Sequence, residues 1–406
     1  MKTIKFILVV LLIQLIISCS NDDQGVRGTN VLTTFDFTAV DPNQIPDVIF
    51  ANDQNGNLIA ELSLGGVPDV YQLTSDELYL AGNFTLSLFN ESSSGTEKSL
   101  STFYQVPVGQ TLQIPESNYQ YDGELKLNFD LSGTTNHQVN VYGLRRQFID
   151  QSDDGAGQFS YTFAYNEEAS ANRLFIKLRY TEIGGMTRYA HLWVNDYTSS
   201  NEYFYTIPDF AETLLNRPTL NDEADDYSGF DLYGVLNGFN CNLYDPVTRD
   251  FYTVTEGFDN YLIRYYGGYT DDYTHQKRIV TNTFPENITT IRPNWDMNYS
   301  FVNNALAIEV NGQFSLLTLR TSYENTPNDI NWDLYAPPVS GTYNLPELPS
   351  SLSADYQNHF NSGNPFDQDY APMSHFTAYP NYNNLIINYL SNRTEHDGDE
   401  RLIKYF

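Results

Sequence analysis

Four acidic side chains in one short polar stretch have the residue types and spacing of a possible metal site. Asp222, Glu223, Asp225 and Asp226 lie within the segment NDEADD. Ca²⁺ binds about six to eight oxygen ligands in flexible loops, and carboxylates supply many of them. A solvated acidic linker is the preferred interpretation, because runs of like charge usually stay in solvent. We therefore expect no cofactor, with Ca²⁺ as the alternative.

A tyrosine-rich stretch, YLIRYYGGYTDDY, is the second candidate, as a surface for ligand binding. A tyrosine ring combines a flat apolar face with a polar hydroxyl, which suits contact with sugar rings. Tyrosines on strands also serve as ordinary packing residues. The candidate ligand-binding residues in this stretch are Tyr261, Tyr265, Tyr266 and Tyr269.

Catalytic signatures are missing from the sequence. It contains no GxSxG, no phosphate-binding glycine loop, no GxGxxG and no HExxH. The chain has 51 acidic residues, so a carboxylate pair suited to hydrolysis cannot be singled out from them. We therefore expect a protein that is not an enzyme. The alternative is a secreted hydrolase of polysaccharides or peptides, with a carboxylate site in residues 219–406.

The charge balance excludes one class of partner. The chain has 21 Lys and Arg residues against 51 Asp and Glu residues, which gives a formal net charge of −30. Such a chain repels phosphate backbones, so we expect no nucleic-acid partner.

The N-terminus predicts a secretion signal. Lys2 and Lys5 precede the apolar run Phe6–Ile17. This run is shorter than the ~20 apolar residues that a membrane-spanning helix needs. A charged start, a short apolar run and a small residue are the order of a signal peptide.

The end of this signal resembles the lipobox of bacterial lipoproteins, in Ile16-Ile17-Ser18-Cys19. The resemblance implies cleavage before Cys19 and acylation of its thiol and its new amino group. The next residues, Ser20-Asn21-Asp22-Asp23, resemble the acidic export signal of surface-exported lipoproteins of Bacteroidetes. We therefore expect a lipid-anchored outer-membrane protein that faces the cell exterior, with the periplasmic face as the alternative.

Only one other cysteine, Cys241, is present. If Cys19 is acylated, no disulfide forms within the chain. The neighbours of Cys241 are Asn240 and Asn242, which lack the positive charge that activates a thiol. We expect Cys241 to be a buried, unreactive thiol.

Alternation of apolar and polar residues predicts the fold class. In LKLNFDL, residues 125–131, leucine and phenylalanine alternate with polar residues, which is typical of a half-buried strand. Asn55-Gly56, Gly184-Gly185 and Asn311-Gly312 lie between apolar runs and predict hairpin turns. These features indicate an all-β fold of tandem antiparallel β-sandwich modules with a larger C-terminal β-rich domain.

The expected organisation follows from lapses in this alternation and from proline and polar clusters. We expect a signal peptide at 1–18, a lipidated tether at 19–30, a small β-sandwich at 31–116, a second β-sandwich at 117–208, a linker helix at 209–218 and the larger β-rich domain at 219–406. Residues 46–64 resemble prealbumin-like sandwiches of extracellular bacterial proteins, through Val48-Ile49-Phe50, Asp53, Gly56 and Leu58.

Together these features favour a lipid-anchored, cell-surface protein that acts without catalysis, in ligand binding, adhesion or assembly of an envelope complex. The expected partners are the outer membrane, through the lipid anchor, and either a glycan or an envelope protein.

Overall fold

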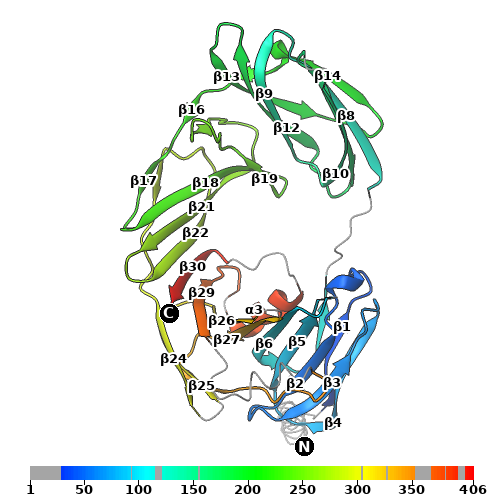
Figure 1. The fold of residues 1–406 in the computed structure, drawn as a ribbon, viewed down its shortest axis with the longest axis vertical. Helices are drawn as coiled ribbons and strands as arrows, with labels where there is room; N and C mark the ends of the chain where they lie inside the picture. The colour runs from blue at the N-terminus through cyan, green and yellow to red at the C-terminus, as the bar shows by residue number, and fades with distance from the viewer. Residues whose placement is uncertain are drawn as a thin grey trace, which may run out of the picture.

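The computed structural model describes residues 29–92, 94–114, 121–153, 156–302, 305–325, 328–352, 367–379, 381–391 and 398–406. This part of the chain is built almost entirely of strands, as Figure 1 shows, so the prediction of an all-β fold is confirmed. Its helical elements are α3 (Tyr382–Ser391) and two 3-10 turns, η1 (Pro42–Gln44) and η2 (Ile207–Asp209). Among the described residues, no helix is long and apolar enough to cross a lipid bilayer.

Twelve strands from distant parts of the chain form one hydrogen-bonded sheet (Figure 1). Their order in the sheet is β19 (Phe239–Asn242), β18 (Tyr227–Leu236), β21 (Asn260–Tyr269), β22 (Tyr273–Thr281), β30 (Glu400–Tyr405), β29 (Asp367–His375), β26 (Leu316–Asn325), β27 (Asn328–Ala336), β6 (Glu97–Pro107), β5 (Asn83–Glu91), β2 (Val48–Asn52) and β3 (Leu58–Ser63). Neighbouring strands are antiparallel except at the junction of β27 and β6, which is parallel. Strands of the first expected unit, 31–116, therefore share a sheet with strands of residues 316–405.

A buried chain of hydrogen bonds crosses this parallel junction. The indole N–H of Trp332 on β27 donates to the Thr102 hydroxyl on β6, at 2.9 Å. The Thr102 hydroxyl also shares a hydrogen bond of 2.9 Å with the Ser87 hydroxyl on β5. All three residues are buried, so these bonds satisfy polar groups that water does not reach.

A second layer covers the N-terminal end of the large sheet. Its strands, in the order β4-β1-β7, are β4 (Val70–Tyr79), β1 (Thr29–Asp36) and β7 (Gln110–Gln113). Apolar residues of this layer pack against β2, β5 and β6 in one core, to which α3 adds Leu385 and Ile386. The Tyr382 hydroxyl of α3 donates to the Tyr104 carbonyl at 2.7 Å, which ties the helix to β6.

A separate sandwich forms between residues 123 and 212. One sheet consists of β10 (Arg146–Asp153), β11 (Gln158–Tyr165), β8 (Gly123–Asp130) and β14 (Glu202–Thr206), and the other of β15 (Ala211–Glu212), β13 (Thr187–Asn195), β12 (Arg173–Glu182) and β9 (Thr134–Tyr142). Leu125, Leu127 and Phe129 point into its core while the residues between them do not, so the predicted alternation is confirmed.

Three small sheets complete the fold. They pair β24 (Asp296–Val302) with β25 (Ala305–Asn311) and β28 (Gly341–Asn344), β16 (Leu215–Asn216) with β20 (Phe251–Tyr252), and β17 (Thr219–Asn221) with β23 (Asn287–Thr289). Leu306 and Ile308 of β25 pack with Leu317 and Trp332 of the large sheet in a common core.

Two local predictions are wrong. Residues 209–218 form the end of η2 and the short strands β15 and β16 instead of a linker helix. Asn311-Gly312 does not close a hairpin, because β25 pairs with β24 and β28 whereas β26 pairs with β27 and β29. The hairpin turns at Asn55-Gly56 and Gly184-Gly185 are confirmed, between β2 and β3 and between β12 and β13.

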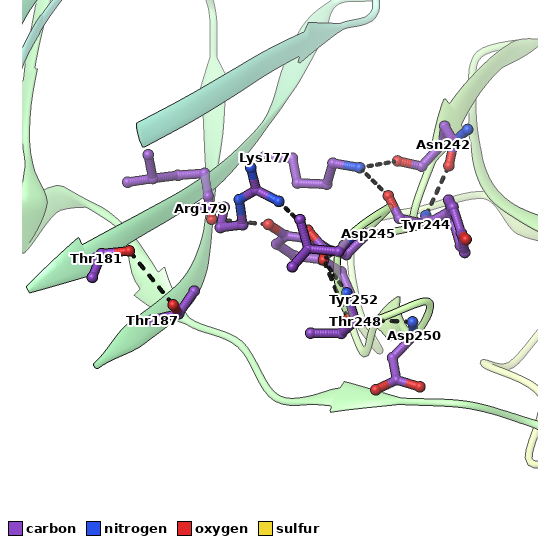
Figure 2. A network of polar contacts seen from close by, with 12 residues as sticks. Lys177, Arg179, Thr181, Thr187, Asn242, Tyr244, Asp245, Thr248, Asp250 and Tyr252 are labelled. Carbon is purple, nitrogen blue, oxygen red and sulfur yellow. Dashed lines mark hydrogen bonds and ion pairs between the residues drawn. The ribbon is translucent and has the colours of Figure 1, made fainter. Parts of the chain in front are cut away.

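The sandwich contacts the large sheet through an apolar core and a polar network. Phe175 on β12 is buried in the same cluster as Leu232 and Ile263 of the large sheet. Beside this cluster, the ammonium group of Lys177 donates to the carbonyl oxygens of Asn242, at 3.1 Å, and Tyr244, at 2.7 Å (Figure 2).

Arg179 and Asp245 extend this network. One nitrogen of the Arg179 guanidinium lies 3.5 Å from a carboxylate oxygen of Asp245 (Figure 2). The other carboxylate oxygen of Asp245 accepts hydrogen bonds from the backbone N–H groups of Val247 and Thr248. The buried carboxylate therefore caps a turn and meets a cation from the sandwich.

Candidate functional site

A pocket of about 570 Å³ opens on one face of the large sheet. Pockets that hold small molecules usually have volumes of about 300–1,000 Å³. The walls come from the β18–β19 hairpin, from β21 and β22, from the loop after β29 and from the residues just before β30. The lining residues are Val235, Gly238, Asn240, Arg264, Tyr265, Tyr266, Gln276, Lys277, Arg278, Phe376, Ala378, Tyr379, Gly398 and Asp399.

Two arginines from adjacent strands lie side by side in this pocket. Arg264 on β21 is the direct cross-strand partner of Arg278 on β22. Since residues directly opposite each other project from the same face of a sheet, the two side chains are neighbours. Both are exposed and neither forms an ion pair among the described residues, although Asp231 on β18 is the direct cross-strand partner of Arg264 on its other side. The Arg264 guanidinium instead lies 5.1 Å from the centre of the Tyr233 ring.

Tyr266 and Gln276 form the next cross-strand pair on the same face. The Tyr266 side chain is 40% exposed, so its ring is available to a ligand. Its hydroxyl reaches across to β18, where a Cβ atom at Gly229 would lie only 2.5 Å from it. Glycine at this position therefore allows the tyrosine ring to lie along the sheet.

The loop wall of the pocket, residues 376–379, is held by Asp399. The backbone N–H of Asp399 donates to the His375 carbonyl at 2.8 Å, and its own carbonyl accepts from the Arg278 N–H at 2.8 Å. Its carboxylate accepts from the Thr377 N–H at 2.6 Å. Asp399 thus connects the loop to the strand that carries Arg278.

Gly398 makes this close approach possible. Its φ is +65°, and a Cβ atom there would lie 2.8 Å from the His375 carbonyl oxygen. A larger residue would meet both a backbone clash and an unfavourable left-handed conformation.

Glu400 lies next to the pocket and accepts two hydrogen bonds at one carboxylate oxygen. It accepts from His275 Nε2 at 3.0 Å and from the Lys277 ammonium at 2.9 Å. Burial acts to raise the pKa of Glu400, but these hydrogen bonds and the charge of Lys277 outweigh burial and hold the pKa below its usual value. Glu400 is therefore a charged structural group rather than a proton donor.

The lining offers little for catalysis. Its described residues include no serine, threonine, cysteine or histidine, and Asp399 is their only acidic member. Hydrolysis by a carboxylate pair needs a second carboxyl group facing the first. The groups present are instead suited to contact: guanidinium groups, aromatic rings and amides.

The structure separates the four tyrosines that the sequence suggested. Tyr266 faces the pocket, whereas Tyr261 is only 2% exposed and donates from its hydroxyl to the Val254 carbonyl. Tyr265 and Tyr269 are also buried. Alternation along β21 points these three rings toward the core, so Tyr266 is the tyrosine of this set with an accessible face.

The acidic segment lies beside the same hairpin. Both carboxylate oxygens of Asp225 accept from Thr270, one from its N–H and one from its hydroxyl, at 2.8 and 2.9 Å. The Asp226 N–H donates to the Gly268 carbonyl at 3.2 Å. The two sets of residues that the sequence singled out therefore meet at one end of β21.

This acidic segment does not form a metal site. Within the described ranges, no three His, Cys, Asp or Glu side chains come together as ligands for a metal ion. Asp225 is turned toward Thr270. Asp222 lies near the buried hydroxyls of Tyr265 and Tyr269. Burial is the main cause that raises the pKa of both tyrosines, and Asp222 adds to it. Asp222 and Asp225 therefore point toward different partners.

Cys241 is a free thiol in the core of the contact between sandwich and sheet. Burial, and to a smaller extent the charge of Asp259, raises its pKa to about 12. The expectation of a buried thiol is confirmed. Cys19 lies outside the described residues.

Comparison with known proteins finds no family model that matches the chain and no similar sequence among curated proteins. The assignment of this pocket as the candidate site therefore rests on its geometry alone. The sequence reasoning missed Arg264 and Arg278, although alternation within LIRYY and HQKRIV indicates that both arginines face away from the core.

Proposed function

We propose that this chain is a lipid-anchored, cell-surface protein that binds a ligand without converting it, and that the pocket containing Arg264, Arg278 and Tyr266 is its binding site. The observation that carries the proposal is the composition of the lining. It combines two guanidinium groups that form no ion pair among the described residues, the exposed ring of Tyr266 and amide side chains in a volume of about 570 Å³.

The state of the nearby carboxylates supports binding over hydrolysis. Asp399 holds the loop wall, and Glu400 is bound to His275 and Lys277. A general acid needs a raised pKa and free geometry, whereas the pKa of Glu400 is lowered and the Asp399 carboxylate is bound to the Thr377 N–H. The hydrolase alternative for residues 219–406 has no comparable observation in its favour.

The position of the pocket suits a tethered receptor. Its residues lie between 235 and 399, far along the chain from the expected anchor at Cys19. Rigid strands carry Arg264, Tyr266 and Arg278, and side chains on strands hold a binding geometry better than side chains on loops.

A binding screen with product analysis tests the proposal. The acylated chain in detergent is incubated with a panel of oligosaccharides and peptides, and bound and released material is identified by mass spectrometry. We expect an unaltered ligand to be recovered, and the Tyr266→Ala variant to bind it at least about tenfold more weakly. Release of cleavage products that stops when one carboxylate is replaced would establish the hydrolase instead.

A further inference from the structure

We infer that the ligand of this pocket is an acidic saccharide, one that carries carboxylate or sulfate groups. This inference rests on the proposed function and specifies its ligand. It starts from the direct cross-strand pairing of Arg264 and Arg278. Like charges directly opposite each other destabilise a sheet. An anion bound between the two guanidinium groups removes that repulsion.

The arginine pair lies in a strongly acidic protein. The chain has a formal net charge of −30, with 51 acidic residues against 21 basic ones. Several cations of the described chain form ion pairs, as Lys277 does with Glu400 and Arg320 with Asp333. Arg264 and Arg278 form no ion pair in the described structure, and with Lys277 they place three cations in a lining whose one carboxylate belongs to Asp399.

Arginine selects the kind of anion. A guanidinium presents a planar fork of N–H groups that matches the two oxygens of a carboxylate or the oxygens of a sulfate. Cross-strand partners have Cβ atoms about 5 Å apart, so the two forks reach one acid group together or two acid groups on adjacent rings. Their strands hold this spacing fixed.

The rest of the pocket favours a saccharide over an acidic peptide. Tyr266 and Tyr379 offer ring faces to the apolar side of a sugar. Asn240 and Gln276 each carry both a donor and an acceptor, which matches the hydroxyl groups on the rim of a sugar ring. Gln276 is the cross-strand partner of Tyr266, so one ring face and one amide lie next to the two arginines.

The acidic surface also limits how much charge the ligand carries. A nucleic acid with one charge in every ~1.7 Å is repelled along its length. A short oligosaccharide or a chain end places its few acid groups inside the pocket. We therefore expect binding to saturate with oligosaccharides of a few residues and to weaken as salt screens the charges.

The test is a paired array. Oligosaccharides bearing uronate carboxylates or sulfate groups are compared with the same rings after methyl esterification or desulfation, together with acidic peptides, and the Kd of each hit is measured by calorimetry on the full chain. We expect binding to be confined to acidic saccharides. The carboxylate and sulfate arms identify which acid group the site takes.

Variants assign the effect to the arginines. We expect Arg264→Gln and Arg278→Gln each to weaken binding about ten- to hundredfold, the usual effect of losing charge-assisted hydrogen bonds. Both side chains are exposed, so folding is preserved, and circular dichroism checks this. The matched control, Arg188→Gln, removes the same charge from the sandwich, where Arg188 pairs with Glu182 and Glu212, and should leave Kd unchanged.

The possible outcomes separate the inference from the proposed function. Equal binding of neutral and acidic sugars, with loss in Tyr266→Ala, would keep the binding function and overturn the acidic ligand. A preference for acidic peptides, or acidic sugars that bind equally well to Arg264→Gln, would also overturn it. Absence of binding in every arm would overturn both.

Discussion

The ammonium group of Lys177 on β12 lies 2.7 Å from the carbonyl oxygen of Tyr244, across the contact between the sandwich and the large sheet. The side chain is only 6% exposed and has no carboxylate in hydrogen-bond contact among the described residues. A cation in this position is held by carbonyl dipoles and by the Tyr252 ring, whose centre is 5.0 Å away. The docking of the two parts therefore includes a buried proton-binding group.

Stability should depend on pH through this lysine. Burial lowers the pKa of Lys177 from 10.5 to about 8. Between these values the unfolded chain binds a proton that the folded chain has released, so the free energy of unfolding rises with pH. Between pH 8 and 10.5, the free energy of unfolding of the wild type should rise by up to about 3 kcal/mol relative to that of Lys177→Met. Urea unfolding at several pH values measures this difference. Parallel curves for the two proteins would show that the lysine is not buried in this contact.

The arginine pair should reduce the stability of the protein without ligand. Replacing Arg278 by Gln removes the repulsion from Arg264, so we expect the free energy of unfolding to rise by about 0.2–1 kcal/mol relative to the wild type. The gain should shrink in high salt, because both side chains are exposed. A loss of stability in low salt would mean that the two guanidinium groups do not repel each other.

The junction of β27 and β6 should depend on one hydroxyl. Thr102→Val keeps the side-chain shape but removes the group that bonds to both Trp332 and Ser87. Because these polar groups are buried, we expect a loss of about 2–4 kcal/mol in the free energy of unfolding. Ser101→Ala, at the neighbouring and less buried position, serves as the control and should change stability by less than about 1 kcal/mol. Equal losses would assign the effect to strand propensity rather than to the hydrogen bonds.

The expected anchor is tested by Cys19→Ala. Several acyl chains hold a protein stably on a membrane, at about 0.8 kcal/mol for each buried methylene, whereas a chain without them has no such attachment. We expect the variant to lose labelling by radioactive palmitate and to leave the membrane fraction. Cys241→Ala should retain both properties, because that thiol is buried in the core. Labelling that persists in Cys19→Ala would refute the lipid anchor.

The fold was predictable where local patterns decide it. Alternation at residues 125–131 and turn residues at Gly184-Gly185 are properties of a few neighbouring residues, and the structure has the expected strand and hairpin there. The pairing of β27 with β6 joins Trp332 to Leu100, which no local pattern specifies. At Asn311-Gly312 the local pattern predicts a hairpin, but the flanking strands β25 and β26 pair with β24 and β27 instead of with each other.

The site was only partly predictable for a related reason. Alternation along a strand places Tyr266 on one face of β21 and Tyr261, Tyr265 and Tyr269 on the other. The sequence does not say which of the two faces is buried. That choice is made by the sandwich, which packs Phe175 against the face carrying Tyr261 and Ile263. The residue types alone indicated tyrosine as a contact group. The pairing of Arg264 with Arg278 could be recognised only from the register of the β21–β22 hairpin.

The place of β30 in the large sheet has a consequence for the order of folding. This strand follows every other described strand along the chain, yet it lies between β22 and β29. During synthesis, both of those strands leave the ribosome with a bare hydrogen-bonding edge. The two halves of the sheet are joined through this strand only after residues 400–405 have emerged. Until then, the bare edges of β22 and β29 must be kept from pairing with strands of other chains.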